Sequence, residues 1–198
     1  MHLKSILSVL AGVLFVVAYV PYIRTILRKE TQPAKVSWII WASLDGIAFA
    51  GMLIKHAVNG QIVGALCGSW TVAILALKHG KAGWSMLDKL CLGGAVLGIV
   101  LWLAFRSPEV GIVTSLSVMF LGSFPTFASA WNDPSKENRT AWTIFFSSCV
   151  VAMLAIPAAT LADAAQPTTF LLTETIMVGI LYLRPRRLGR IDRDPGRC

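Results

Sequence analysis

The sequence predicts an all-α membrane protein with seven transmembrane helices, arranged as two parallel three-helix repeats joined by a spacer helix. Three observations lead to this prediction: an apolar composition, seven apolar runs near spanning length, and a pattern shared by the two halves. The 198 residues are 56% hydrophobic and only 14% charged, whereas soluble domains carry about 25% charged residues. Because so much apolar surface does not fit inside a compact soluble core, we expect a lipid bilayer to be the solvent of this chain.

Seven apolar runs reach or approach the length of a membrane-spanning helix, which is about 20 residues. The predicted spans are residues 5–23, 36–54, 58–77, 89–105, 110–131, 140–162 and 167–183. The fourth run is short and rich in glycine, a residue common where membrane helices approach closely. The connections are short, so we expect no inserted soluble domain.

The basic residues of the connections predict the orientation. When Lys89 at the start of the fourth span is counted with the piece before it, the lysines and arginines of the eight non-membrane pieces number one, four, one, three, one, two, none and six. This puts fifteen on one side and three on the other. By the positive-inside rule the N-terminus lies outside and the C-terminus in the cytoplasm, and we expect the bacterial cytoplasmic membrane. A cleaved signal peptide over residues 1–20 is disfavoured, because the region before the apolar run is barely basic.

The net charge of +8 therefore reflects topology, and we expect no nucleic-acid partner. Six of the eighteen basic residues lie in the last fifteen residues, where they fix the topology and are placed to contact anionic membrane lipid.

Two stretches of the chain share one pattern. Residues 20–38, VPYIRTILRKETQPAKVSW, and 124–142, FPTFASAWNDPSKENRTAW, each have a proline, a basic residue 14 positions later and a tryptophan 17 positions later. An offset of 104 residues aligns Pro21 with Pro125 and Trp38 with Trp142. We interpret predicted helices 1–3 as a copy of helices 5–7, with helix 4 as the crossing that restores the same orientation. The predicted units are the first repeat, 1–80; the spacer, 81–108; the second repeat, 109–184; and a basic cytoplasmic tail, 185–198.

The paired prolines and tryptophans are predicted to form a cytoplasmic gate. A proline inside a helix removes a backbone hydrogen bond and kinks the helix, so Pro21 and Pro125 are candidate hinges. Trp38 and Trp142 are candidates for closing the gate. A static kink or helix end is the alternative for each proline, and anchoring in an aromatic belt is the alternative for each tryptophan.

Two acidic residues lie near the middle of predicted spans. Asp45 is tenth in the span 36–54, and Glu174 is near the centre of 167–183. Because a carboxylate in hydrocarbon is costly, such residues usually face the bundle interior or a water-filled cavity and are candidate functional groups. Packing between helices in the protonated form is the alternative for each.

The seven-helix 3+1+3 plan, with prolines near the cytoplasmic ends of helices 1 and 5, resembles the SWEET and PQ-loop group of transporters. The name-giving Pro-Gln pair is absent, because Pro21 precedes Tyr22 and Pro125 precedes Thr126. A further proline, Pro157, falls in predicted helix 6. The resemblance implies this fold and solute transport. It also implies that helices 3 and 7 carry substrate contacts, which makes further candidates of Ser69, Trp70 and Thr173.

We therefore expect a transporter of a small polar solute, such as a sugar or an amino acid, that works by alternating access. Asp45 and Glu174 would select a cation or carry a proton. The alternative is a seven-helix receptor or trafficking protein of similar fold that binds ligand without transport. No metalloprotease, hydrolase or paired-carboxylate motif indicates an enzyme. The cysteines show no metal-ligand spacing, so we expect no metal or cofactor; an oligomer stays open.

Overall fold

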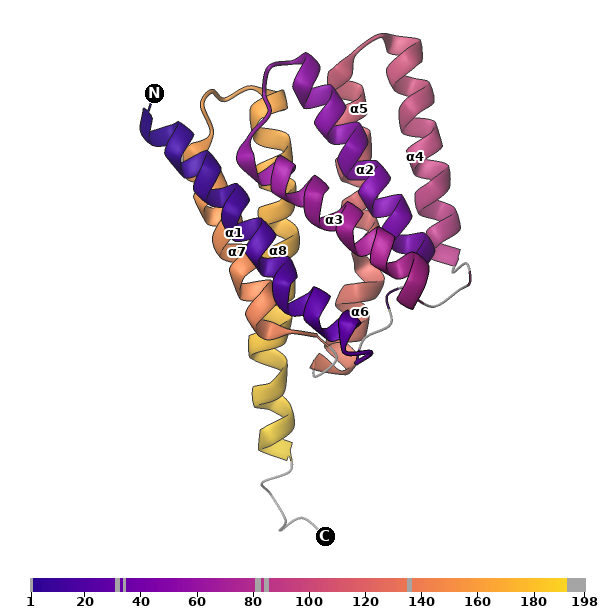
Figure 1. Cartoon of the computed structure of the whole chain (residues 1–198), viewed down its shortest axis with the longest axis vertical. Helices are drawn as coiled ribbons and strands as arrows, with labels where there is room; N and C mark the ends of the chain where they lie inside the picture. Colours follow the sequence, from indigo (N-terminus) through magenta and orange to yellow (C-terminus); the bar gives the residue numbers. More distant parts are fainter. Residues whose placement is uncertain are drawn as a thin grey trace.

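The computed structural model describes residues 2–30, 33, 35–80, 83, 86–134 and 137–191, and within them the chain forms eight helices and no strand (Figure 1). For residues 87, 91, 125, 128, 129 and 185–191 it describes the backbone alone. The helices are α1 (His2–Leu27), α2 (Lys35–Ile54), α3 (Gly60–His79), α4 (Met86–Phe105), α5 (Pro108–Gly122), α6 (Phe124–Asn132), α7 (Arg139–Ala155) and α8 (Leu161–Ile191). Of the predicted tail, residues 192–198 lie outside the described residues.

Four helices of the described chain are long and apolar enough to cross a membrane. These segments are His2–Leu27, Lys35–Ile54, Gly60–His79 and Asp88–Phe105, while Pro108–Gly122 and Arg139–Ala155 are shorter apolar helices. The exposed surface carries many large apolar side chains, such as Leu3, Met86 and Leu103, which are 68%, 71% and 71% exposed. An all-helical chain with this surface is compatible with an integral membrane protein.

Two predicted spans are interrupted in the structure. The span 110–131 is divided into α5 and α6 at Ser123, two residues before Pro125. The predicted span 140–162 is too long, because α7 ends at Ala155 and Pro157 lies in the following loop rather than in a helix. The reason is local: a residue before proline is disfavoured in the helical region, and Ile156 has an extended ψ of 119°.

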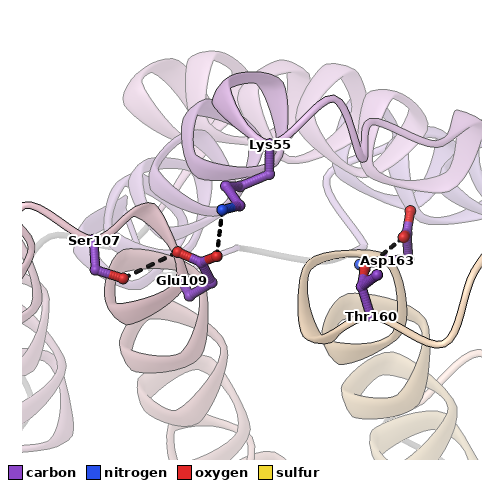
Figure 2. Close-up of polar contacts among 5 residues, drawn as sticks. All are labelled: Lys55, Ser107, Glu109, Thr160 and Asp163. Atoms are coloured by element: carbon purple, nitrogen blue, oxygen red, sulfur yellow. Dashed lines mark hydrogen bonds and ion pairs between the residues drawn. The ribbon is translucent and has the colours of Figure 1, made fainter.

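The last helix begins earlier than the span 167–183 predicts. The Thr160 hydroxyl accepts a hydrogen bond from the Asp163 backbone N–H at 3.1 Å and donates to the Asp163 carboxylate at 2.5 Å (Figure 2). This reciprocal cap satisfies a free N–H of the first turn, so the helix starts at Leu161.

The helices form one bundle, and α8 extends from it toward the C-terminus (Figure 1). We call the end where α1 begins the N-terminal end and the opposite end the C-terminal end. Helix α3 packs between α1 and α2, and α8 packs against α5, α6 and α7. The extensive contacts between these two groups join α1 to α7 and α2 to α5, with smaller ones joining α3 to α7 and α2 to α8, while α4 packs on α5 and α2.

Glycines bring α1 and α3 into backbone contact at the N-terminal end. A Cβ on Gly12 would lie 2.3 Å from the carbonyl oxygen of Gly60, and one on Gly60 would lie 2.1 Å from that of Ser8. No side chain fits into these gaps, so the close crossing requires glycine on both helices.

Candidate functional site

The two predicted acidic residues are buried inside the bundle. Asp45 of α2 is 4% exposed and Glu174 of α8 is 7% exposed. Asp45 lies beside Ser69 of α3, close enough to interact with its hydroxyl. The Tyr19 side chain of α1 lies within electrostatic reach of both carboxyl groups. The structure thus brings groups from α1, α2, α3 and α8 into one region of the bundle.

One oxygen of each carboxyl group lacks a partner. Within the described residues, Asp45 Oδ1 and Glu174 Oε2 are buried and make no hydrogen bond. Most buried polar atoms in proteins are hydrogen-bonded, so an exception calls for an explanation such as a bound group. These two atoms therefore mark the candidate site.

Aromatic rings enclose Tyr19. Its ring centroid lies 5.9 Å from that of Phe15, 6.5 Å from Trp38 and 5.0 Å from Phe145, while Phe15 and Phe145 are 4.7 Å apart. We call Phe15, Tyr19, Trp38 and Phe145 the ring cluster. Because its rings come from α1, α2 and α7, it joins helices of both halves of the chain.

Further rings continue the ring cluster toward the C-terminal end. The ring centroid of Trp38, in the first turn of α2, lies 5.4 Å from those of Tyr22 and Trp41. Trp142, near the start of α7, lies 6.1 Å from Phe145. Apolar rings therefore lie between the carboxyl groups and the C-terminal end.

The predicted gate residues differ in their surroundings. Trp38 and Trp142 are partly buried in ring contacts, and the Trp142 indole N–H donates to Glu137 at 2.9 Å. Burial raises the pKa of the Glu137 carboxyl. Pro21 lies within the continuous helix α1, whereas Pro125 is the second residue of α6. The hinge and gate roles stay predictions.

The other predicted site residues have different surroundings. Trp70 is 45% exposed on the outer surface of α3. Thr173, which precedes Glu174 in α8, donates its hydroxyl proton to the Thr169 carbonyl of its own helix at 2.9 Å. The roles of Ser69, Trp70 and Thr173 in substrate binding stay predictions.

A cavity of about 650 Å³ opens at the N-terminal end. It lies between the first part of α1, the loop before α3, the end of α7 and the start of α8. Its polar lining comes from Lys4, Ser5, Ser8, His56, Asn59, Gln61 and Asp163. The cavity is large enough for a small organic molecule.

Gln61, which lines this cavity, forms a buried pair with Gln166. Gln61 is 1% exposed and Gln166 is fully buried, and Gln166 Nε2 donates to Gln61 Oε1 at 2.9 Å. Asn59 Nδ2 also donates to Gln166 Oε1 at 2.9 Å. Gln61 Nε2 donates to Ser148 Oγ at 3.3 Å and to Cys149 Sγ at 3.1 Å. We call Gln61 and Gln166 the amide pair.

The amide pair links the cavity to one of the acidic residues. The Cys149 thiol accepts a hydrogen bond from Gln61 and is close enough to the Glu174 carboxyl group to interact with it electrostatically. A series of polar groups therefore leads from the cavity through Gln61 and Cys149 to Glu174.

Two lysines tie the halves together at the N-terminal end. Lys55 forms an ion pair with Glu109 at 2.5 Å, and Glu109 also accepts from the Ser107 hydroxyl at 3.0 Å (Figure 2). Lys4 donates to the carbonyl oxygens of Ile156 and Pro157 at 2.8 and 3.3 Å. The Lys55 contact joins the end of α2 to the start of α5, and the Lys4 contact joins α1 to the loop after α7.

The amide pair and Tyr19 were not among the residues that the sequence indicated. A signal existed for Gln61, because a glutamine inside the predicted span 58–77 must find an internal partner in hydrocarbon. For Gln166, the signal was hidden because the predicted span began at 167. A tyrosine in an apolar run gives no such signal.

Comparison with known proteins adds no assignment: no protein-family model, no curated protein and no solved structure matches this chain. Within the described residues, no group of three or more His, Cys, Asp or Glu side chains is placed to hold a metal ion. The functional argument therefore proceeds from the carboxyl groups, the cavity and the rings.

Proposed function

We propose that this protein is a membrane transporter that carries a small polar solute, of the size of a sugar or an amino acid, by alternating access. The observation that carries the proposal is the pair of buried carboxyl groups with unpartnered oxygens, Asp45 and Glu174. They lie between a cavity at one end of the bundle and packed aromatic rings toward the other. Buried acidic residues in membrane helices typically mark a solute or proton pathway.

The proposed architecture is seven spans in two parallel three-helix repeats, with α5 and α6 together as one span and α4 as the spacer. The packing supports it. The first helix of each repeat packs on the second helix of the other, α1 on α7 and α5 on α2. The third helix of each repeat likewise makes a smaller contact with the second helix of the other, α3 with α7 and α8 with α2. Such reciprocity is expected of two repeats related by an axis along the membrane normal.

In the proposed cycle, the solute enters the cavity from outside the cell and passes the amide pair to reach the carboxyl groups. The rings around Trp38 and Trp142 then separate and release it toward the cytoplasm, while the N-terminal end closes. Pro21 in α1 and the break at Ser123 before Pro125 are the proposed hinges, because a helix that lacks hydrogen bonds bends there most easily. Protonation of either carboxyl group would couple transport to a proton gradient.

The direct test is uptake of labelled sugars and amino acids by purified protein in liposomes, with and without a pH gradient. Asp45→Asn and Glu174→Gln test the site, and Glu30→Gln is the control because Glu30 is exposed in the loop after α1. We expect saturable uptake that is lost in the first two variants and kept in the third. Uptake unaffected by all three changes would remove the carboxyl groups from the mechanism, and binding without any uptake would favour a receptor.

A further inference from the structure

Among the described residues, acidic side chains are buried in the bundle and basic side chains are not. The buried polar and charged residues of the described chain are Asp45, Gln61, Ser69, Asp88, Ser115, Ser148, Gln166 and Glu174. Three of these are acidic, and none is lysine, arginine or histidine. Lys4, which lines the cavity, donates to the Ile156 carbonyl, and Lys55 is paired with Glu109.

Asp45 and Glu174 therefore have room for a positive charge that no buried residue of the described chain supplies. Burying an ionised carboxylate is costly unless it is paired and hydrogen-bonded. Each of these carboxyl groups keeps one buried oxygen without a hydrogen bond, and no basic residue is among the buried residues. A solute cation would provide both the missing charge and the missing donors.

The surroundings favour an organic cation over a metal ion. Calcium and magnesium need six or more oxygen ligands, whereas the residue near both carboxyl groups is Tyr19, whose neighbours are the rings of Phe15, Trp38 and Phe145. Aromatic faces attract ammonium and guanidinium groups through the negative charge of the ring face. Carboxylates flanked by rings are the groups that bind such cations.

We propose that the transported solute is a small organic cation, whose ammonium or guanidinium group is bound by Asp45 and Glu174 beside the ring cluster. This inference rests on the proposed transport function and names the substrate class of the same site. The polar lining of the N-terminal cavity, which includes Asn59, Gln61 and Asp163, then guides the cation from the cavity to Glu174.

The test compares probes that differ in charge and hardly in shape. Arginine is matched with citrulline, and choline with 3,3-dimethylbutan-1-ol. Binding to the purified full-length protein is measured by calorimetry, and exchange of the labelled probe is measured by counterflow in liposomes. Wild type, Asp45→Asn, Glu174→Gln and the exposed control Glu30→Gln are compared, and thermal unfolding verifies that each variant is folded.

We expect at least one cation to bind ~30-fold or more tightly than its neutral partner, because a buried charge that loses its partner costs that much in other complexes. This preference should disappear in Asp45→Asn or Glu174→Gln and persist in Glu30→Gln. Equal affinity for charged and neutral partners, or no binding of either cation at millimolar concentration, overturns the proposal.

The two proposals fail in different ways. Counterflow of a neutral sugar or amino acid that ignores solute charge keeps the transporter and overturns the cation site. Selective binding of a cation without counterflow keeps the cation site and overturns transport.

Discussion

The two ends of the bundle are closed by different chemistry. The N-terminal end has close backbone packing of Gly12 on Gly60, the amide pair, two lysine contacts and an open cavity. Toward the C-terminal end the contacts are between aromatic rings, with Trp38 and Trp142 among them. Hydrogen bonds and backbone contacts tolerate little displacement, because their energy depends on distance and direction. Ring contacts allow several arrangements, so we expect the N-terminal end to switch between defined states and the C-terminal end to separate by sliding.

The largest effect is expected where the N-terminal end is packed most tightly. Gly12→Ala places a Cβ against the Gly60 backbone, and overpacking of this kind typically costs about 1–3 kcal/mol or more. Gly46→Ala in α2 is the matched control, because a Cβ there meets no atom within 4 Å. Thermal unfolding in one detergent compares the two. Equal midpoints for both variants would show that the close crossing of α1 and α3 is unimportant.

The amide pair provides the next test. Gln61→Leu or Gln166→Leu leaves the other buried amide without its partner, which costs about 1–3 kcal/mol. The double variant should lose less than the sum of the two single variants, because no unpaired amide remains between them. Strictly additive losses in thermal unfolding would mean that the two side chains do not interact.

A pH-dependent change is expected at the C-terminal end. Burial raises the pKa of Glu137 above its usual 4.5, so its protonated form suits the folded state. Stability is unaffected by this residue below pH 4.5 and falls as the pH rises through the folded pKa, because an ionised group is then partly buried. We expect Glu137→Gln to raise the midpoint of thermal unfolding at pH 8 and to leave it unchanged at pH 4. The rise should be smaller than the drop caused by Gln61→Leu or Gln166→Leu. A loss of stability at pH 8 would contradict this assignment.

The smallest effect is expected for the exposed ion pair. The side chains of Lys55 and Glu109 are 38% and 35% exposed, and such pairs contribute little and are screened by salt. Lys55→Glu should lower the unfolding midpoint slightly at low salt, and the added change Glu109→Lys should restore it. An effect that does not weaken at high salt would show that the contact is not electrostatic.

The sequence predicted the helical class and the burial of the acidic residues well. A charge in the middle of an apolar run leaves few alternatives to the bundle interior, and Asp45 and Glu174 are both buried there. Their role in solute binding, together with the seven-span arrangement, stays a prediction.

Features that depend on packing between distant segments were not predictable in the same way. The amide pair joins residues 105 positions apart, and its geometry depends on how α3 meets α8. The sequence did contain local signals for two corrected boundaries, since Pro157 ends α7 and Thr160 caps α8. Hydropathy outweighed both signals, because Ile156 and its neighbours continue an apolar run.

The most direct test of alternating access is whether the two ends move together. Spin labels at the exposed positions Val58 and Ala159 report the distance across the N-terminal end, and labels at Leu27 and Asn132 report it at the C-terminal end. The measurement uses a chain whose four native cysteines are replaced by alanine. Trp38→Leu removes the ring contacts with Tyr19, Tyr22 and Trp41, and Trp70→Leu on the exposed face is the control.

We expect Trp38→Leu to lengthen the distance at the C-terminal end and to shorten the distance at the N-terminal end, whereas Trp70→Leu changes neither. A longer distance at the C-terminal end with no change at the other would mean that the ends are independent, which contradicts alternating access.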